Sequence, residues 1–513
     1  MPTIGSTLSM SAGRCPSRTA LVFGARSYTY RELDSTVNRT ARALAAQGLG
    51  PGDRMLLMSG NSDGYVIALY AAMRLGVIVV PVNPRSAAPE LQYLLEDSEA
   101  SLLVFGPEVE RAVRRRDAMP SLSLRTPPIA LGRVEGYSSL FEAAEGLSDE
   151  ALEVEVDEAD DAVILYTSGT TGRPKGALFD HHRILWVGLN TSIILRTRDG
   201  DRILHVAPMY HSAELSMLVV GGTLVSATHV VLPGFEPEAV LEAMERERIN
   251  VFFGVPTMYQ MLLRSPSLAQ RDLSSWRVGL FGAAPMPAAT VQSLVEALPG
   301  VDLVQACGQT EGGPGGIYCA PEEVRARPDA SGRLALPNTE VRIVDTAGRD
   351  VVPGVVGEMI MRGETMMKGY WRQPDATAEA VRDGWVHTGD LARIDADRYI
   401  TLVDRLKDLI ITGGRNVYSV EVENALAEHP GVLDVAIISR PSEDFGETIV
   451  AVVTPAPGAT VTLEDLRAFA AERIADYKLP RDLIIREIPR NPSGKILKHV
   501  LRAELGDPAP VQP

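Results

Sequence analysis

The stretch TSGTTGRPKG, residues 167–176, carries more information about this chain than any other. It follows the apolar run AVILY at residues 162–166, which predicts a buried strand. Glycines let successive backbone N–H groups face one anion, hydroxyl side chains add donors, and a lysine adds positive charge. The stretch supplies all three through Gly169, Gly172 and Gly176, through Ser168, Thr170 and Thr171, and through Lys175. The pattern predicts a loop that binds phosphate.

This loop differs from the phosphate loop of P-loop nucleotidases. That motif places Gly-Lys-Ser/Thr at the start of a helix, five residues after its first glycine. Here the fifth residue after Gly169 is Pro174, which has no N–H to donate. A Gly/Ser/Thr-rich stretch is also typical of a surface turn, but the strand before it and Lys175 favour phosphate binding. The string resembles the nucleotide loop of the adenylate-forming superfamily of acyl-CoA synthetases, peptide-synthetase adenylation domains and luciferases.

Composition limits the classes of protein to consider. With 513 residues, the chain is long enough for two or more domains. A net charge of −16 argues against nucleic acid as a partner. The three cysteines, Cys15, Cys307 and Cys319, are too few for a disulfide framework or a zinc site, which favours a cytoplasmic protein. We expect no secretory signal and no membrane span, since the longest apolar stretch, residues 204–232, contains His205, His211, Glu214 and His229.

The order of predicted elements indicates an α/β fold with two domains. Short β-like runs alternate with helical patterns, which is typical of layered α/β sheets. From about residue 341, short alternating strands predict a small antiparallel or barrel-like unit. We expect an N-terminal domain at residues 1–403, a hinge at 404–408 and a mobile α+β lid at 409–513. Two helix starts are predicted, one by the capping box of Thr29 and Glu32 and one by Thr462 and Asp465, with the second helix ending near Tyr477.

Five further strings resemble the same superfamily and follow its order along the chain. They are GAAP at residues 282–285, GQTE at 308–311, WVHTGD at 385–390, DRLKD at 404–408 and PSGKI at 492–496. Each string alone is also typical of a strand-to-helix turn, an exposed acid or a solvated linker. Together with the first loop, the ordered matches identify the chain as a member of the adenylate-forming superfamily over essentially its whole length.

The resemblance implies an ATP site and a role for each matching residue. Asp390 would accept from the ribose hydroxyls and Arg405 would reach the ribose. Thr310 would contact phosphate, and Glu311 would be a ligand of Mg²⁺, a cation that prefers carboxylate oxygen. The implied ATP-binding residues are Thr167, Ser168, Gly169, Thr170, Thr171, Gly172, Lys175, Gly282, Ala283, Ala284, Pro285, Cys307, Gly308, Gln309, Asp390 and Arg405.

The resemblance further implies two half-reactions served by one lid. The acid would first attack the ATP α-phosphate to give an acyl adenylate and pyrophosphate, with Lys495 acting at the α-phosphate. The thiol of coenzyme A would then attack the mixed anhydride and release AMP. Between these steps the lid would turn about Lys407, so that Gly413 and Gly414 line the pantetheine tunnel. The implied catalytic residues are Lys495, Thr310, Glu311 and Lys407.

Residues around His211 bear on the identity of the acid. Adenylation domains that take amino acids place an aspartate where this chain has His211, so an amino acid is disfavoured. Alone, His211 is equally consistent with a core histidine. Small or apolar neighbours favour a fatty or aromatic acid, as in medium- or long-chain fatty acid and hydroxycinnamate (feruloyl-type) CoA ligases, and Gly282, Gly315 and Gly316 suggest room. The predicted acyl pocket comprises His211, Glu214, Val255, Gly312 and Gly313.

Three residues depart from the family pattern. Cys307 stands where an aromatic usually stacks on adenine, and Val420 replaces a common proline. Glu214 stands where a small residue is common, so its side chain either intrudes on the pocket or points away. Two alternatives to a CoA ligase stay open: an acyl-AMP ligase that loads a carrier protein, and a non-catalytic ATP- or acyl-binding homologue. The expected partners are a small carboxylic acid, ATP and CoA, and a homodimer is left open.

Overall fold

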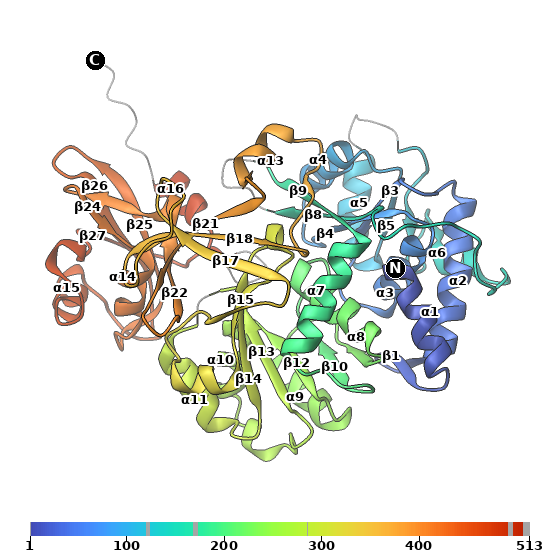
Figure 1. The fold of residues 1–513 in the computed structure, drawn as a ribbon, viewed down its shortest axis with the longest axis horizontal. Helices are drawn as coiled ribbons and strands as arrows, with labels where there is room; N and C mark the ends of the chain where they lie inside the picture. Colours follow the sequence, from blue (N-terminus) through green and yellow to red (C-terminus); the bar gives the residue numbers. More distant parts are fainter. Residues whose placement is uncertain (1, 119–123, 168–172, 285, 491–495, 506–513) are drawn as a thin grey trace.

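A computed structural model describes residues 2–118, 124–167, 173–284, 286–490 and 496–505 of the chain. A large N-terminal domain of layered α/β sheets is followed by a smaller α+β unit, which confirms the predicted fold class. Figure 1 shows the first helices, α1 (Ile4–Arg14) to α3 (Asp63–Arg74), on the right and the C-terminal unit on the left. Strands coloured yellow in that view lie between the two parts.

One sheet carries the predicted buried strand. Its order is β19-β9-β8-β4-β3-β5-β6-β7. Strands β8, β4, β3, β5 and β6 are parallel, so their carboxyl ends share one edge, where ligands usually bind. The bounds are β3 Arg54–Met58, β4 Ile78–Val82, β5 Leu102–Phe105, β6 Ile129–Ala130, β7 Ser138–Ser139, β8 Asp161–Thr167, β9 Lys175–Asp180 and β19 Gly369–Tyr370.

A second sheet is formed mainly by strands from the middle of the chain. Its order is β16-β15-β14-β13-β12-β10-β11-β1-β2, and the strands from β14 to β1 are parallel. Apolar side chains cover both faces, as expected of a buried parallel sheet. The bounds are β1 Thr19–Phe23, β2 Arg26–Thr29, β10 Arg202–His205, β11 Thr228–Val231, β12 Val251–Gly254, β13 Val278–Gly282, β14 Asp302–Gly308, β15 Gly316–Cys319 and β16 Leu334–Ala335.

Helices cover the faces of these sheets. The capping box of Thr29 and Glu32 opens α2, as predicted, and α3 is buried along almost its whole length. A π-helix, η2 (Ala213–Val220), follows β10 and is followed by α8 (Gly221–Leu224). The other helices of this domain are α2 Tyr30–Ala46, α4 Ala88–Ser98, η1 Pro107–Val109, α5 Glu110–Asp117, α6 Leu140–Ala144, α7 His181–Ile194, α9 Pro237–Arg246, α10 Pro256–Arg264, η3 Leu268–Gln270, α11 Ala288–Ala297, η4 Thr310–Gly312, α12 Pro321–Ala326 and α13 Pro374–Ala380.

A small antiparallel sheet follows, as the alternating strands predicted. It comprises β17 (Thr339–Val344), β18 (Val356–Gly363), β20 (Val381–Arg382), β21 (Trp385–Ile394) and β22 (Ile400–Arg405). The inner face packs Met359, Met361 and Ile343 against Ile317 of β15, which joins this sheet to the second one. Residues 404 and 405 of the predicted hinge belong to β22 and pair with Leu391 and Asp390.

The C-terminal unit has its own sheet and core. Its strands are β23 (Ile410–Thr412), β24 (Arg415–Val417), β25 (Val432–Ser442), β26 (Gly446–Pro455) and β27 (Asp482–Ile485). The helices are η5 Leu406–Asp408, α14 Ser419–Ala427, α15 Leu463–Ala471, η6 Asp476–Lys478 and α16 Lys498–Leu505.

One predicted helix in this unit ends earlier than expected. Thr462 caps α15, but the helix stops at Ala471 and Tyr477 lies in the separate turn η6. The N–H groups of Arg473 and Ile474 both return to the Ala470 carbonyl oxygen, which closes the helix. In the part of the chain that the structure describes, no helix is long and apolar enough to span a membrane.

Candidate active site

The predicted phosphate loop connects the strands of a β-hairpin. Thr167 is the last residue of β8, Lys175 is the first of β9, and the two residues are paired. Because Thr167, Lys175 and Gly176 belong to strands, the loop is shorter at both ends than the sequence predicted. The Lys175 ammonium lies 5.2 Å from the centroid of the Tyr370 ring. The predicted donors Ser168, Gly169, Thr170, Thr171 and Gly172 lie outside the described residues.

The Glu311 carboxylate lies beside the end of this hairpin. Its Oε1 accepts from the Thr167 hydroxyl at 3.1 Å and from the Tyr370 hydroxyl at 2.9 Å. Burial and the neighbouring Glu311 charge raise the pKa of Tyr370, so the phenol keeps its proton and donates to the carboxylate. Tyr370 was not predicted as a site residue. Its contact depends on β19 pairing with β9, which no local pattern reveals.

This carboxylate has the chemistry that a nucleotide-bound Mg²⁺ requires. Among the described residues, no group of three or more His, Cys, Asp or Glu side chains is placed to hold a metal ion. Mg²⁺ commonly takes one or two carboxylates and completes its shell with phosphate and water. The residues present therefore fit an ion that arrives with ATP better than a resident metal centre.

Thr310 precedes Glu311 and links two segments of the site. Its hydroxyl lies 3.2 Å from the hydroxyl of Ser212, the residue before the π-helix η2. Gln309 before it has an extended backbone. At Gly308 a Cβ atom would lie 2.2 Å from the Gly315 carbonyl oxygen, so β14 and β15 approach closely only because this residue is glycine.

Asp390 and Arg405 form an ion pair across neighbouring strands. Arg405 Nε lies 2.9 Å from Asp390 Oδ1, and the two residues are directly paired between β21 and β22. Burial and the Asp390 charge raise the pKa of the Cys307 thiol to about 12, so it stays protonated. Cys307 packs against the core of the small antiparallel sheet. The structure therefore brings together three residues that the sequence assigned to the nucleoside.

The GAAP turn after β13 has an unusual backbone. Gly282 lies against the next strand, and a Cβ atom there would be 2.2 Å from the Ala306 carbonyl oxygen. Ala283 has φ = +67°, a conformation that L-residues rarely adopt. Such strain is concentrated at functional sites, and Ala283 is exposed. Ala284 is half-buried, and Pro285 lies outside the described residues.

His211 and Tyr210 form the centre of the predicted acid pocket. Their ring centroids are 4.4 Å apart, and burial lowers the pKa of His211 to about 4, so the imidazole is neutral. The Tyr210 hydroxyl and His211 Nε2 are buried without a hydrogen-bond partner among the described residues. Val255 is buried and immediately precedes α10.

The glycines near this pocket do not leave open space. A Cβ atom would lie 2.6 Å from Met361 Cε at Gly312, 2.1 Å from the Thr365 carbonyl oxygen at Gly313 and 2.1 Å from Leu336 Cδ1 at Gly315. At Gly316 it would lie 2.7 Å from Met361 Sδ. The expectation of room at Gly282, Gly315 and Gly316 is therefore wrong, because these glycines allow close packing of neighbouring segments.

Glu214 is the first acidic residue of η2, and its side chain is buried. Its Oε1 lies 2.6 Å from His205 Nδ1, and His205 Nε2 lies 2.9 Å from His229 Nδ1. Of the two orientations that the sequence left open, the carboxyl group takes the one that points away from the predicted pocket. It is buried against His205 of β10, so Glu214 does not line the pocket as predicted. The two histidines were noted only as interruptions of an apolar stretch, because their contact depends on β10 and β11 being neighbours.

The predicted residues of the C-terminal unit lie at its start and near its end. Lys407 is in η5 after the Asp390–Arg405 pair, and burial lowers its pKa. Gly413 and Gly414, with φ of +56° and +74°, form the turn between β23 and β24. Two successive positive φ angles define the turn that favours glycine in tight hairpins. Lys495 lies outside the described residues.

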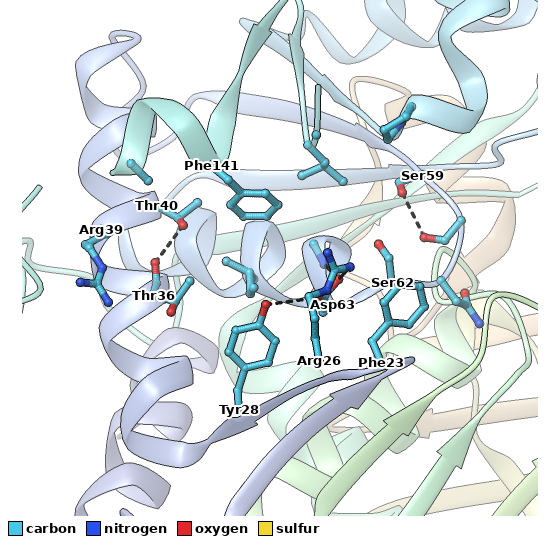
Figure 2. Close-up of a pocket in the computed structure, with 18 of the residues that line it drawn as sticks. Phe23, Arg26, Tyr28, Thr36, Arg39, Thr40, Ser59, Ser62, Asp63 and Phe141 are labelled. Carbon is cyan, nitrogen blue, oxygen red and sulfur yellow. Dashed lines mark hydrogen bonds and ion pairs between the residues drawn. The ribbon is translucent and has the colours of Figure 1, made fainter. Parts of the chain in front are cut away.

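A separate cavity of about 810 Å³ lies near the N-terminus (Figure 2). Figure 2 shows Arg26 and Tyr28 of β2 converging on Asp63 of α3, with Phe141 opposite them. None of the sequence-predicted site residues that the structure describes lines this cavity. Asn61, one of its lining residues, binds the backbone of Ala207 and Met209, so the cavity is joined to the segment that leads to His211.

Comparison with known proteins identifies the family. The AMP-binding enzyme family matches residues 8–371, and the C-terminal domain of AMP-binding enzymes matches residues 421–495. A feruloyl-CoA synthase from an Amycolatopsis species is 38% identical over 98% of this chain and 99% of its own. A long-chain-fatty-acid–CoA ligase, FadD13 of Mycobacterium tuberculosis, is 34% identical over 94% of each chain.

A solved structure shows the same architecture. ATP-bound MatB from Rhodopseudomonas palustris is 31% identical, with a TM-score of 0.89 over 98% of this chain and 99% of that one. The fold of this chain therefore matches that structure over nearly the whole length of both. The chain belongs to the AMP-binding enzymes of the adenylate-forming superfamily.

Proposed function

We propose that this enzyme is an ATP-dependent acyl-CoA ligase. A carboxylic acid and ATP give an acyl adenylate and pyrophosphate, and the thiol of coenzyme A then displaces AMP to give the acyl-CoA. The observation that carries the proposal is the convergence of Thr167 and Tyr370 on one oxygen of Glu311, next to Thr310. This arrangement offers hydroxyl donors and a hard carboxylate at the carboxyl ends of β8 and β14.

The first half-reaction needs charge stabilisation and positioning. A carboxylate is a poor acyl donor, and transfer to the α-phosphate replaces oxide with AMP as the leaving group. Negative charge gathers around phosphorus, so fixed donors and cations lower the barrier. In this proposal Lys175 and Thr167 serve the β- and γ-phosphates, Thr310 the α-phosphate, and Lys495 both the acid and the α-phosphate. Mg²⁺ held by Glu311 would supply further charge neutralisation on the phosphates.

The nucleoside would be held between the small antiparallel sheet and the second sheet. Asp390 is positioned by the Arg405 guanidinium and by its own N–H, which donates to the Thr388 hydroxyl at 3.0 Å. A carboxylate fixed in this way can accept from two ribose hydroxyls. Gly282 and Ala283 would lie along the adenine, with Cys307 in place of a stacking ring.

Lys407 would serve as the pivot between half-reactions. It lies in η5, the short turn that follows β22, where the small antiparallel sheet meets the C-terminal unit. We propose that residues 409–513 turn about this point, which removes Lys495 and brings Gly413 and Gly414 to the pantetheine arm. Three free cysteines fit a reducing compartment, so we also propose a cytoplasmic enzyme.

For the acid, we propose an aromatic molecule of the hydroxycinnamate type, with a medium- or long-chain fatty acid as the alternative. The Tyr210 hydroxyl and His211 Nε2 have no hydrogen-bond partner among the described residues, which supports a substrate that carries a hydrogen-bonding substituent. A buried polar group without a partner disfavours a plain hydrocarbon chain, whereas a hydroxyl or methoxy group can pair with it. The filled glycines at residues 312–316 also support a compact acid rather than a long one.

A panel of acids tests this proposal. We expect acid-dependent ATP–pyrophosphate exchange and CoA thioester formation, with hydroxycinnamic acids about tenfold better in kcat/KM than cinnamic acid or fatty acids of matched length. Preference for a fatty acid would replace the aromatic assignment. Exchange without CoA thioester formation would indicate a ligase for another acceptor such as a carrier protein, and no exchange with any acid would contradict the proposed function.

A further inference from the structure

A chain of buried hydrogen bonds runs behind the acid site. It begins at Glu214 in η2 and passes through His205 of β10 and His229 of β11 to Thr223 of α8, where His229 Nε2 lies 3.1 Å from the Thr223 hydroxyl. All four side chains are at most 2% exposed. Tyr70 of α3 donates to the Thr223 oxygen at 2.7 Å.

The Thr223 end fixes the direction of every proton in this chain. The Thr223 hydroxyl has one proton, and it donates this proton to the Val219 carbonyl oxygen at 2.9 Å. Its oxygen therefore accepts from both Tyr70 and His229, which fills its two lone pairs. His229 must then carry its proton on Nε2 and accept at Nδ1 from His205 Nε2. His205 in turn accepts at Nδ1, so Glu214 has to be the donor.

The opposite direction is disfavoured by burial. With both histidines neutral, it would leave Glu214 either ionised or with its proton on Oε2, an atom that has no hydrogen-bond partner among the described residues. An isolated buried carboxylate is far more costly than a buried carbonyl oxygen of the neutral acid. Burial raises the pKa of Glu214 and lowers the pKa values of His205 and His229, in agreement with three uncharged groups.

We propose that Glu214 is an uncharged carboxylic acid that donates to His205. In this proposal the chain of hydrogen bonds from Glu214 to Thr223 positions the π-helix and the His211 segment, which binds the acid substrate. The link to the substrate rests on the proposed function. The start of η2 is bonded to the His211 segment, because the Leu215 N–H donates to the His211 carbonyl oxygen at 3.0 Å. Ser212 between them contacts Thr310. Long π-helices are rare and need tertiary support, which the Glu214–His205 bond supplies.

Other titratable or charged side chains near this chain of hydrogen bonds bind groups outside it. His181 at the start of α7 accepts from the Ile4 N–H, and Arg14 of α1 binds the Leu224 carbonyl oxygen and Ser226. Within the described residues, the neutral His205 is the one basic side chain with a nitrogen within 4.0 Å of the Glu214 carboxyl oxygens. The protonation of Glu214 therefore follows from burial and from the hydrogen-bond chain.

Two substitutions of Glu214 test whether residue 214 acts as a hydrogen-bond donor to His205 rather than as a negative charge. Glu214→Gln can donate to His205 Nδ1 through its amide, so its KM for the acid should stay within about twofold of wild type. Glu214→Leu removes the donor, so its KM for the acid should rise by about tenfold or more while the KM for ATP changes little. Leu218→Met in the same π-helix conserves volume and serves as the control. An unchanged acid KM in Glu214→Leu, or equal damage in Glu214→Gln, overturns the proposal.

Infrared spectroscopy tests the protonation directly and does not depend on activity. The wild type should show the carbonyl stretch of a protonated carboxyl, shifted in D₂O and absent in Glu214→Gln. The folded-state pKa of Glu214 lies above its unfolded value, so the stability from the neutral form is complete at low pH and is lost as pH rises. The Tm of Glu214→Gln relative to wild type should therefore increase from about pH 5 to about pH 8.

These measurements keep the two proposals distinct. Absence of the infrared band, or a Tm difference that is flat or falls with pH, overturns the uncharged Glu214 even if the enzyme is a CoA ligase. Wild-type protein without acid-dependent exchange contradicts the proposed function but leaves the spectroscopic result intact.

Discussion

At the scale of single residues, Glu311 connects segments that lie far apart in the chain. Thr167 and Tyr370 donate to the same oxygen from β8 and β19. Residues named in sequence motifs were accessible to prediction because each motif is continuous. Tyr370 and Ser212 were not, because they reach the site through strand pairing and a loop contact that only the fold creates.

We predict that Glu311→Gln lowers kcat/KM for adenylation by about 100-fold and raises the Mg²⁺ concentration needed for half-maximal rate. Tyr370→Phe removes only one donor and should cost about 2- to 10-fold. Exchange rates measured across a Mg²⁺ titration compare the two variants. An unchanged Mg²⁺ requirement in Glu311→Gln would contradict the metal role of this carboxylate.

Cys307 gives a second prediction at this scale. A ring at this position could stack on adenine, so Cys307→Tyr should lower the KM for ATP by about 2- to 10-fold. Cys307→Ser, which adds no ring, is the control and should leave that KM unchanged. If Cys307→Tyr leaves the KM unchanged or raises it, adenine is already held by other means.

At the scale of elements, the strands and helix caps were predictable and the π-helix was not. An apolar run identified β8, and a capping box identified the start of α2. The π-helix has an ordinary apolar sequence, and its one acidic side chain, Glu214, bonds to His205 of β10, which in turn contacts His229 of β11. Helix α15 was predicted too long. The helical pattern of the sequence continues past Ala471, but the backbone bonds of residues 473 and 474 to the Ala470 carbonyl oxygen end the helix there.

The Thr223 hydroxyl, in α8 directly after that π-helix, accepts from two buried side chains. Thr223→Val removes the acceptor for both His229 and Tyr70, so the free energy of unfolding should fall by about 1–3 kcal/mol. Thr223→Ser keeps the hydroxyl and should lose much less. Denaturant unfolding of the two variants measures the difference, and equal losses would show that the hydroxyl contributes little.

In the β23–β24 hairpin, Gly413 has a role in the turn and a proposed role in the pantetheine tunnel, and substitutions can distinguish the two. Asparagine tolerates a positive φ, so Gly413→Asn should keep the turn and the Tm while obstructing the proposed pantetheine tunnel. We expect thioester formation to fall by about tenfold or more with pyrophosphate exchange unchanged. Gly413→Val strains the turn itself and should lower the Tm. Normal thioester formation in Gly413→Asn would assign this glycine to the turn alone.

At the scale of the whole molecule, the proposed catalytic residue Lys495 lies more than three hundred positions after the loop that identified the family. The order of motifs was sufficient to predict two domains and a nucleotide site. The acid was less predictable, because the predicted pocket residues Gly312 and Gly313, like Gly315, are packed against segments that are distant in the sequence. The hydrogen-bond chain behind His211 likewise depends on four separate elements.

The most direct test of the central claim is acid-dependent ATP–pyrophosphate exchange by wild type and Lys495→Ala. We predict that Lys495→Ala loses at least about 100-fold in exchange yet still converts supplied acyl adenylate and CoA to thioester. Lys478→Ala, which removes a lid lysine that pairs with Glu421, is the control and should keep exchange. Full exchange by Lys495→Ala together with lost thioester formation would contradict the account.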